Sequence, residues 1–286
     1  MKHFRPRLSR RAFWVLCALL VCLRLALTGF QQAYIWVGGA PLDDELMFRA
    51  ANHITAGQWL GAYDYLTLSK AMFFPVWLAL LHALHLPYLI SGAALWCGAA
   101  LLAAFAFSTL WRKKDPAQGR VLTLGLFAVL AFLPSSWAAY TLRVYRDNIF
   151  PELCLYFFAG MAGMALRAVF TPEKPLWPWL AAAGAGLACG YLDREDAGLF
   201  LLPFAAAATV IVAVVLAGKR RWKALAAQVI PYVMLGVGVL TFCTLNYTHY
   251  GVFALSDFSE GSFAAAMGAM MRVDTDSTAP YLSVPA

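Results

Sequence analysis

Residues 13–30 read FWVLCALLVCLRLALTGF, an apolar run whose one charged side chain is Arg24. The run is too long for the apolar core of a typical signal peptide, and it lacks a convincing A-x-A cleavage site. It is long enough to cross a bilayer, whose hydrocarbon core needs about 20 mostly apolar residues. We therefore expect a retained first membrane span over residues 12–30. Arg24 is costly in the outer half of such a span unless it snorkels or forms a structural pair.

The composition of the whole chain extends this interpretation. Of the 286 residues, 62% are hydrophobic and 13% are charged, whereas about a quarter of the residues of a soluble domain are charged. Apolar runs of spanning length recur along the sequence. The chain is therefore predicted to be an all-α polytopic membrane protein of the cell (inner) membrane. Its net charge of +7 lies in short clusters between apolar runs, so it indicates orientation and gives no reason to expect nucleic acid as a partner.

The positions of the basic clusters predict the topology. Residues 1–11 are rich in Lys and Arg and are expected in the cytoplasm. Six further spans are expected over residues 88–110, 121–140, 149–168, 176–191, 197–217 and 225–246, which makes seven. The segment 71–86 is short and contains Pro75, and if it crossed, the basic cluster at 111–115 would lie outside. We expect it to be a re-entrant or interfacial helix.

This topology divides the chain into three parts. They are a cytoplasmic N-terminus (1–11), a membrane domain (12–246) with a first outer loop over 31–87, and an extracytoplasmic tail (247–286). Only Asp115 and Glu173, of 15 acidic residues, fall on the inner side. Because acidic residues contribute little to orientation, this asymmetry indicates a functional outer face. The chain also reads as a truncated or fragmentary version of something longer.

The first outer loop contains the densest acidic stretch, since residues 41–48 read PLDDELMF. A proline followed by acids is typical of a helix start, because carboxylates complement the positive end of the helix dipole. An amphipathic helix is expected to run to Gly57. Asp43 is interpreted as the cap. Two interpretations of Asp44 remain open: it is a helix-start acid, or it is a catalytic carboxylate at the boundary of water and lipid.

Charged side chains of three outer segments are predicted to lie near one another. The segments are residues 43–45, 143–147 and 193–196, and Lys70 enters the interfacial helix from the same side. Arginine binds phosphate through two parallel hydrogen bonds, and a carboxylate beside it can accept a proton from a nucleophile. These features favour a lipid-phosphate-linked substrate. The simpler alternative for Arg143 and Arg146 is contact with lipid headgroups.

The order of these motifs resembles a known family. The matching residues are Asp44, Glu45 and Phe48 in Asp-Glu-x-x-aromatic, Gly61–Tyr63 in Gly-x-Tyr, Lys70 and Pro75 before the interfacial helix, and Arg143, Arg146 and Asp147 in the second outer loop. Over residues 12–246 the chain resembles the GT-C class of membrane glycosyltransferases, which includes protein O-mannosyltransferases and lipid A aminoarabinose transferases. The resemblance implies a GT-C-like core, a polyprenyl-phosphate sugar donor and a catalytic aspartate in the first outer loop.

Carried onto this sequence, the resemblance makes Asp44 the catalytic residue. The substrate-binding residues are then Glu45, Lys70, Arg143, Arg146 and Asp147. The context of Asp147, Arg-Val-Tyr-Arg-Asp-Asn, departs from the usual Asp-Pro, and residues 193–196 have no counterpart in the family. The sequence indicates no metal site and does not identify a cofactor.

The expected function is transfer of a sugar from a polyprenyl-phosphate donor to an acceptor on the outer face, with membrane lipid and that donor as partners. The main alternative is a transporter or lipid-handling protein without transferase activity. Transporters usually place ionisable residues near the midplane in helices related by a repeat, whereas the charges here lie at the ends of spans. A third interpretation is a structural or assembly subunit.

Overall fold

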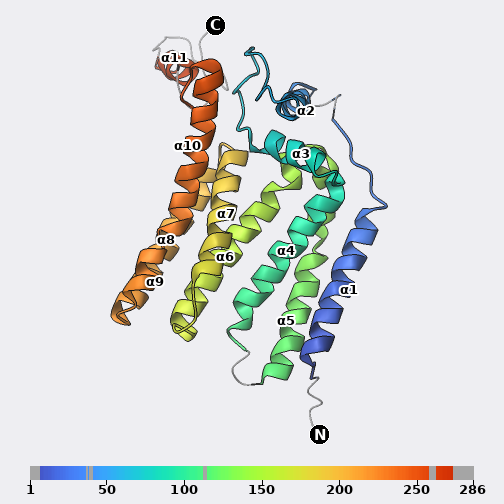
Figure 1. Cartoon of the computed structure of the whole chain (residues 1–286), viewed down its shortest axis with the longest axis vertical. Helices are drawn as coiled ribbons and strands as arrows, with labels where there is room; N and C mark the ends of the chain where they lie inside the picture. The colour runs from blue at the N-terminus through green and yellow to red at the C-terminus, as the bar shows by residue number, and fades with distance from the viewer. Residues whose placement is uncertain (1–6, 37, 39–40, 112–114, 258–261, 273–286) are drawn as a thin grey trace.

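The computed structural model describes residues 7–36, 38, 41–111, 115–257 and 262–272. Within these residues the fold is all-helical, and the only bridge of the β type is an isolated one between Tyr34 and Arg143. Long helices run side by side in an elongated bundle (Figure 1). We call the end of the bundle that carries α2 and α3 the outer end and the opposite end the inner end.

The helices follow the predicted apolar segments closely. In chain order they are α1 Arg10–Thr28, α2 Pro41–Thr55, α3 Phe73–Ala83, α4 Tyr88–Ser108, α5 Pro116–Ala131, η1 Pro134–Trp137, η2 Ala139–Leu142, η3 Arg146–Asn148, α6 Phe150–Phe170, α7 Trp177–Asp193, α8 Ala197–Gly218, α9 Trp222–Ala227, α10 Ile230–Tyr250 and α11 Ser262–Met270.

The fold is all-helical and compatible with a multi-pass membrane protein. By length and composition, 5 helical segments of the described chain can cross a membrane, namely α1, α4, α6, α8 and the combined α9–α10, and α5 with the turns after it would make 6. Helix α7 has 17 residues and falls outside this set, although it packs against both α6 and α10. Seven spans therefore remain a prediction.

The third predicted span, 121–140, is a helix that begins earlier and bends. Asp115 caps the start of α5 by accepting hydrogen bonds from the next turn, and the segment Pro134–Leu142 then leaves the axis of α5 at 45°. The bend has a local cause in Pro134, because a proline has no N–H and disfavours helical geometry in the residue before it. Leu133 is accordingly extended, with φ −61° and ψ 125°.

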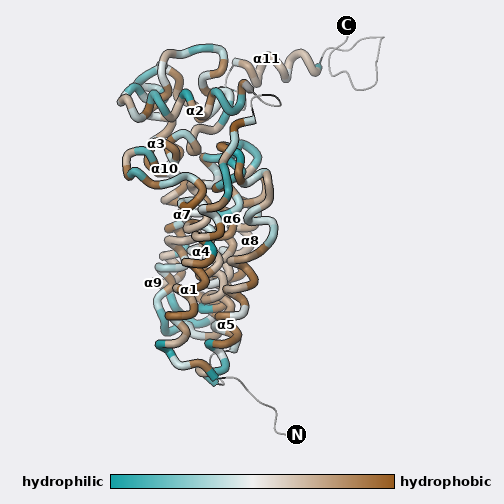
Figure 2. Tube along the Cα trace, turned by 90° about the vertical axis from the view of Figure 1, so that its right-hand side faces the viewer, coloured by the Kyte–Doolittle hydropathy of each residue, from teal (hydrophilic) through white to brown (hydrophobic). Residues whose placement is uncertain are grey.

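The two short helices α2 and α3 lie at the outer end instead of within the bundle. Helix α3 has 11 residues, which is about 16 Å and too short to span the hydrocarbon core, and it lies across the ends of the long helices (Figure 1). Hydrophobic residues dominate the middle of the bundle and hydrophilic residues gather toward its two ends (Figure 2). Charged side chains at the outer end are thus positioned above the apolar part.

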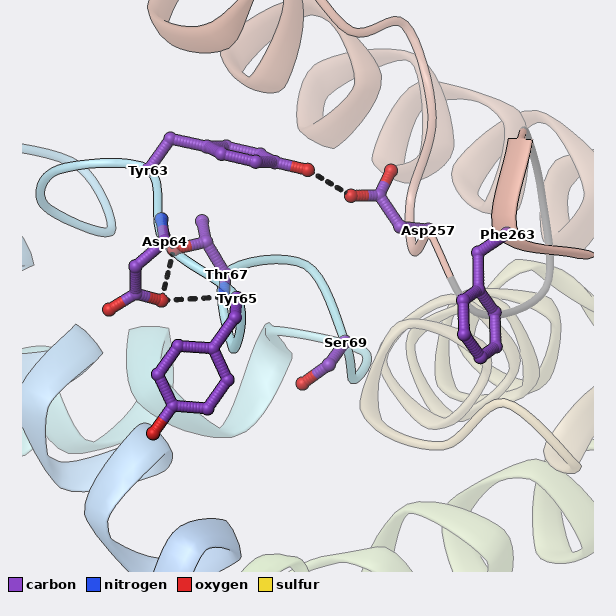
Figure 3. Close-up of a pocket in the computed structure, with 7 residues that line it drawn as sticks. All are labelled: Tyr63, Asp64, Tyr65, Thr67, Ser69, Asp257 and Phe263. Carbon is purple, nitrogen blue, oxygen red and sulfur yellow. Dashed lines mark hydrogen bonds between the residues drawn. The ribbon is translucent and has the colours of Figure 1, made fainter.

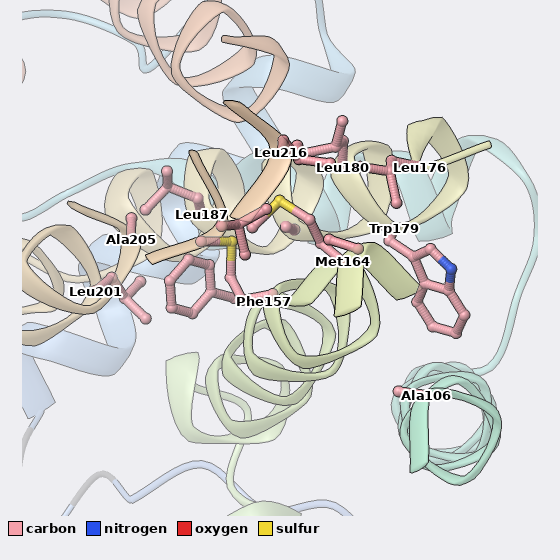
Figure 4. Packing of buried hydrophobic residues seen from close by; sticks show 14 of the residues in the cluster. Ala106, Phe157, Met164, Leu176, Trp179, Leu180, Leu187, Leu201, Ala205 and Leu216 are labelled. Carbon is pink, nitrogen blue, oxygen red and sulfur yellow. The ribbon is translucent and has the colours of Figure 1, made fainter. Parts of the chain in front are cut away.

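The main hydrophobic core lies between α6, α7 and α8, where Phe157, Met164 and Leu187 are fully buried (Figure 4). Helices α6 and α7 approach closely because glycines lie at their contact. A Cβ at Gly160 would come within 2.5 Å of the backbone nitrogen of Ala183. Small residues at such a contact let two membrane helices pack backbone to backbone.

Arg24 of α1 has a structural role within this bundle. Its guanidinium is 1% exposed and donates hydrogen bonds to the Thr28 hydroxyl (2.6 Å) and to the carbonyl of Ser136 (2.8 Å). It also lies over the ring of Trp137, 4.2 Å from the centroid. These contacts engage both terminal nitrogens of the guanidinium and tie α1 to the bent segment after α5, while Nε has no hydrogen-bond partner among the described residues.

Candidate functional site

The candidate site begins with a backbone pairing that joins two outer segments. The amide of Val144 donates to the carbonyl of Tyr34 (2.8 Å), and the amide of Tyr34 donates to the carbonyl of Leu142 (3.1 Å). This pairing places Arg143 beside the first turn of α2. The end of the first span and the second outer loop, far apart in the sequence, therefore meet at Asp44.

Asp44 is enclosed by donors. Arg143 Nε lies 2.9 Å from Oδ1 and 3.2 Å from Oδ2, and Arg143 Nη2 also donates to Oδ1. The backbone amide of Trp36 donates to Oδ2 at 2.6 Å. The side chains are nearly closed to solvent, at 1% exposed for Asp44 and 11% for Arg143. The hydrogen bond to Asp44 raises the pKa of Arg143.

Aromatic rings complete the environment of Arg143. Its guanidinium lies 4.3 Å from the ring centroid of Tyr145 and 5.3 Å from that of Trp36. A guanidinium over an aromatic face gains electrostatic attraction to the ring while the ring excludes water. Arg143 is therefore held on its edge by a carboxylate and on its face by aromatic rings.

Asp43 and Lys70 form the accessible part of the cluster. Lys70 Nζ lies 3.7 Å from Asp43 Oδ1, an ion pair longer than a hydrogen bond, and the two side chains are 34% and 38% exposed. Asp43 Oδ2 accepts a weak hydrogen bond from the Tyr145 hydroxyl (3.3 Å). The ammonium group of Lys70 therefore keeps donors available at the surface.

Arg146 connects this cluster to the segment after α7. It donates to both carboxylate oxygens of Glu195 (3.0 and 2.9 Å), to the carbonyl of Asp193 (3.0 Å) and to the Tyr145 hydroxyl (2.9 Å). Glu195 also accepts from the amide of Ala71 at 2.5 Å. Burial opposes ionisation of Glu195, but the charge of Arg146 and the hydrogen bonds outweigh it and lower the pKa of Glu195.

The residues singled out in the sequence separate into two groups. Asp44, Arg143, Arg146 and Lys70 lie in one continuous network through Asp43 and Tyr145. Two others lie apart from it. Asp147 pairs with Arg194 at 3.3 Å, and Glu45 is exposed and has no hydrogen bond or ion pair to a described residue.

Two members of the network carried no role in the sequence analysis. Tyr145 contacts both arginines and Asp43, yet it stands in the sequence simply as an aromatic residue between two basic ones. Glu195 had no counterpart in the resemblance, and the packing of α7 against α6 brings it to Arg146, which lies just before α6. The Arg-Val-Tyr-Arg pattern was the available signal for Tyr145.

Two buried carboxyl groups lie near the network. Asp193, the last residue of α7, is fully buried and neither side-chain oxygen has a hydrogen-bond partner among the described residues. Glu152, in the first turn of α6, has one oxygen in the same state. Both stand at the outer ends of their helices, far from the middle of the bundle. This placement differs from the midplane sites usual in transporters.

A pocket of about 540 Å³ lies between the first outer loop and the segment after α10, and Figure 3 shows its lining. The lining residues are Tyr63, Asp64, Tyr65, Thr67, Ser69, Asp257 and Phe263. The Tyr63 hydroxyl donates to Asp257 and thereby joins the first outer loop to the segment after α10. That hydrogen bond raises the pKa of Tyr63 to about 12.

Within the described part of the chain, no group of three or more His, Cys, Asp or Glu side chains is arranged to hold a metal ion. The exposed Asp43 and Lys70 side chains offer acid–base and phosphate-binding chemistry, while Arg143 and Arg146 hold carboxylates. No protein-family model matches the sequence, and comparisons with curated proteins and with solved structures return no match.

Proposed function

We propose that this protein transfers a sugar from a polyprenyl-phosphate donor to an acceptor at the outer end of the bundle. The observation that carries the proposal is the Asp43–Lys70 pair, a surface carboxylate and ammonium 3.7 Å apart above a membrane-spanning bundle. This position suits a substrate whose phosphate lies at the headgroup level and whose lipid chain lies in the bilayer. The resemblance to the GT-C class gives the proposal its reaction.

In the proposed reaction an O–H or N–H group of the acceptor attacks the anomeric carbon of the donor sugar. The bond between that carbon and the phosphate oxygen breaks, and its electron pair leaves with the polyprenyl phosphate. A carboxylate takes the acceptor's proton. Lys70 stabilises the charge that develops on the leaving phosphate, because an ammonium group offers several donors to phosphate oxygens.

Two neighbouring carboxylates compete for the role of base. Asp44 is the family's choice, but both of its oxygens accept hydrogen bonds from Arg143 and Trp36. For Asp44 to take a proton, the 2.6 Å hydrogen bond from the Trp36 amide must open first. Asp43 is reached without that movement. We assign the role of base to Asp44 on the resemblance to the GT-C class and keep Asp43 as the alternative base. The matched variants Asp44→Asn and Asp43→Asn distinguish the two.

Arg143 and Arg146 act in this proposal chiefly by positioning. Each guanidinium already holds a carboxylate, Asp44 for Arg143 and Glu195 for Arg146. Their hydrogen-bonding edges are therefore committed before a donor arrives. Lys70 is left as the cation that meets the phosphate, while the arginines hold α2 and the segment after α7 around it.

The first test uses undecaprenyl phosphate, the leaving group common to bacterial polyprenyl-phosphate sugars, so the sugar need not be known. Its binding to the purified protein in nanodiscs is measured for the wild type, Lys70→Gln and the control Lys223→Gln at the inner end. Removing one phosphate contact is expected to weaken binding by about 10- to 100-fold, since hydrogen bonds to charged groups contribute about 1.5–3 kcal/mol. Equal affinity for the wild type and Lys70→Gln would remove Lys70 from the proposed donor site.

A further inference from the structure

A second cavity lies at the inner end, remote from the candidate site. Its volume is about 720 Å³, within the range of pockets that bind small molecules. Its walls come from α4, the start of α5, the end of α6 and the start of α7, with the loop between α6 and α7 at its rim. We propose that this cavity binds the headgroup of an anionic glycerophospholipid of the cytoplasmic leaflet. The inference does not rest on the proposed sugar transfer.

Two basic side chains of the cavity are free to bind a phosphate. Arg167 and Lys174 both line it, and neither forms an ion pair with any residue in the described ranges. Arg167 donates one hydrogen bond, from Nη1 to the carbonyl of Pro175 at 3.0 Å, and its guanidinium lies over the ring of Trp179, 5.2 Å from the centroid. The contact with the ring uses the face of the guanidinium, so its other N–H donors have no hydrogen-bond partner among the described residues. This differs from the outer end, where each arginine of the network holds a carboxylate.

The remaining lining matches the rest of such a lipid. Leu102 and Phe105 of α4 provide apolar wall, while the hydroxyls of Ser108 and Thr171 lie at the same cavity. The indole of Trp179 also lines it, and its N–H has no hydrogen-bond partner among the described residues. Apolar wall beside donors and cations suits a molecule that is a phosphate at one end and hydrocarbon at the other.

The charge of the cavity favours an anionic headgroup. Among the described lining residues, Glu173 is the acid that opposes Arg167 and Lys174, so these three side chains sum to a net charge of about +1, opposite in sign to the headgroup of phosphatidylglycerol. A zwitterionic lipid would bring its own ammonium group close to Arg167 and Lys174. Basic pockets between helices on the cytoplasmic side are a recurrent form of anionic lipid site.

Phosphatidylglycerol binding by the full chain in detergent, measured by native mass spectrometry, tests the proposal. Lys174→Gln is the primary variant, because Lys174 is exposed and its side chain has no hydrogen-bond or ion-pair partner among the described residues. It should weaken binding about fivefold, the loss expected for one basic residue at a lipid surface, and Arg167→Gln should do the same. Glu173→Gln should strengthen binding, since it removes the opposing charge.

Three controls make the outcome decisive. Lys223→Gln removes an exposed basic residue from the inner end outside the cavity, so it should leave the affinity unchanged. Phosphatidylcholine with the same acyl chains should bind more weakly, and inorganic phosphate should not displace the lipid. Unchanged affinity in Lys174→Gln, an equal loss in Lys223→Gln, equal binding of phosphatidylcholine, or displacement by inorganic phosphate would each overturn the proposal.

Discussion

The buried pair of Asp44 and Arg143 gives the most quantitative prediction. If Asp44 were only an acid at an exposed helix start, its loss would cost about 0.3–1 kcal/mol. The side chains are 1% and 11% exposed, and removing one partner of a buried ion pair leaves an uncompensated charge that costs about 3–5 kcal/mol. We therefore expect Asp44→Asn and Arg143→Gln each to lower the free energy of unfolding by about 3–5 kcal/mol.

The double variant isolates the interaction. Asp44→Asn with Arg143→Gln removes both charges, so its cost should be smaller than the sum of the single costs by about 0.5–3 kcal/mol. Unfolding of the purified protein in mixed micelles with increasing SDS, followed by tryptophan fluorescence and circular dichroism, measures all four species. The control is Asp43→Asn, whose partner Lys70 lies 3.7 Å away and is partly exposed, and whose cost should be at most about 1 kcal/mol.

The reasoning is refuted if Asp44→Asn costs no more than Asp43→Asn and the double variant is additive. The prediction also governs how activity assays of Asp44 are interpreted. Loss of a general base costs about 10²–10⁴-fold in rate, but a variant destabilised by several kcal/mol can lose activity by unfolding. Transfer rates for Asp44→Asn therefore need to be divided by the folded fraction measured in the same membrane.

Three further predictions follow from single contacts. The pKa of Glu195 is lower in the folded protein, so its pairing with Arg146 stabilises the fold above the ordinary pKa of a glutamate, and this stabilisation is lost as pH falls through the folded pKa. Glu195→Gln should therefore flatten the acid side of a plot of melting temperature against pH. An unchanged acid side would contradict the assignment. Gly160→Leu should disrupt the contact of α6 with Ala183 and reduce the yield of monodisperse protein in size-exclusion chromatography, whereas a wild-type yield would show that the helices can separate there. Arg24→Ala should lower the free energy of unfolding by about 1.5–3 kcal/mol in the same micelle assay, and a change below about 0.5 kcal/mol would mean that its hydrogen bonds are replaced by water.

Much of the fold could be predicted because a membrane-spanning helix requires a continuous apolar run, which can be recognised from the local sequence alone. The apolar runs at 12–30 and 197–217 lie within two residues of α1 and α8 at each end. Proline also acts locally, so the bend after α5 has a signal at Pro134 that the prediction of one continuous span passed over. The number of spans was less predictable, because α7 is short and glycine-rich and its place depends on its neighbours.

The sequence predicted which segments contribute to the site, and the tertiary structure decided which of their side chains contact one another. Charge segregation along the sequence is a one-dimensional property, and it was enough to indicate that acids and arginines gather at the outer end. Which carboxylate meets which arginine depends on the orientation of helices far apart in the chain. Asp44 contacts Arg143 because the segment around Tyr34 pairs with the second outer loop. The pattern of apolar and polar residues in the sequence does not predict that pairing. Packing in three dimensions buries the Asp44 carboxylate, whose oxygens accept hydrogen bonds from the protein, and leaves the adjacent Asp43 accessible to water. The sequence alone does not distinguish these two neighbouring acids.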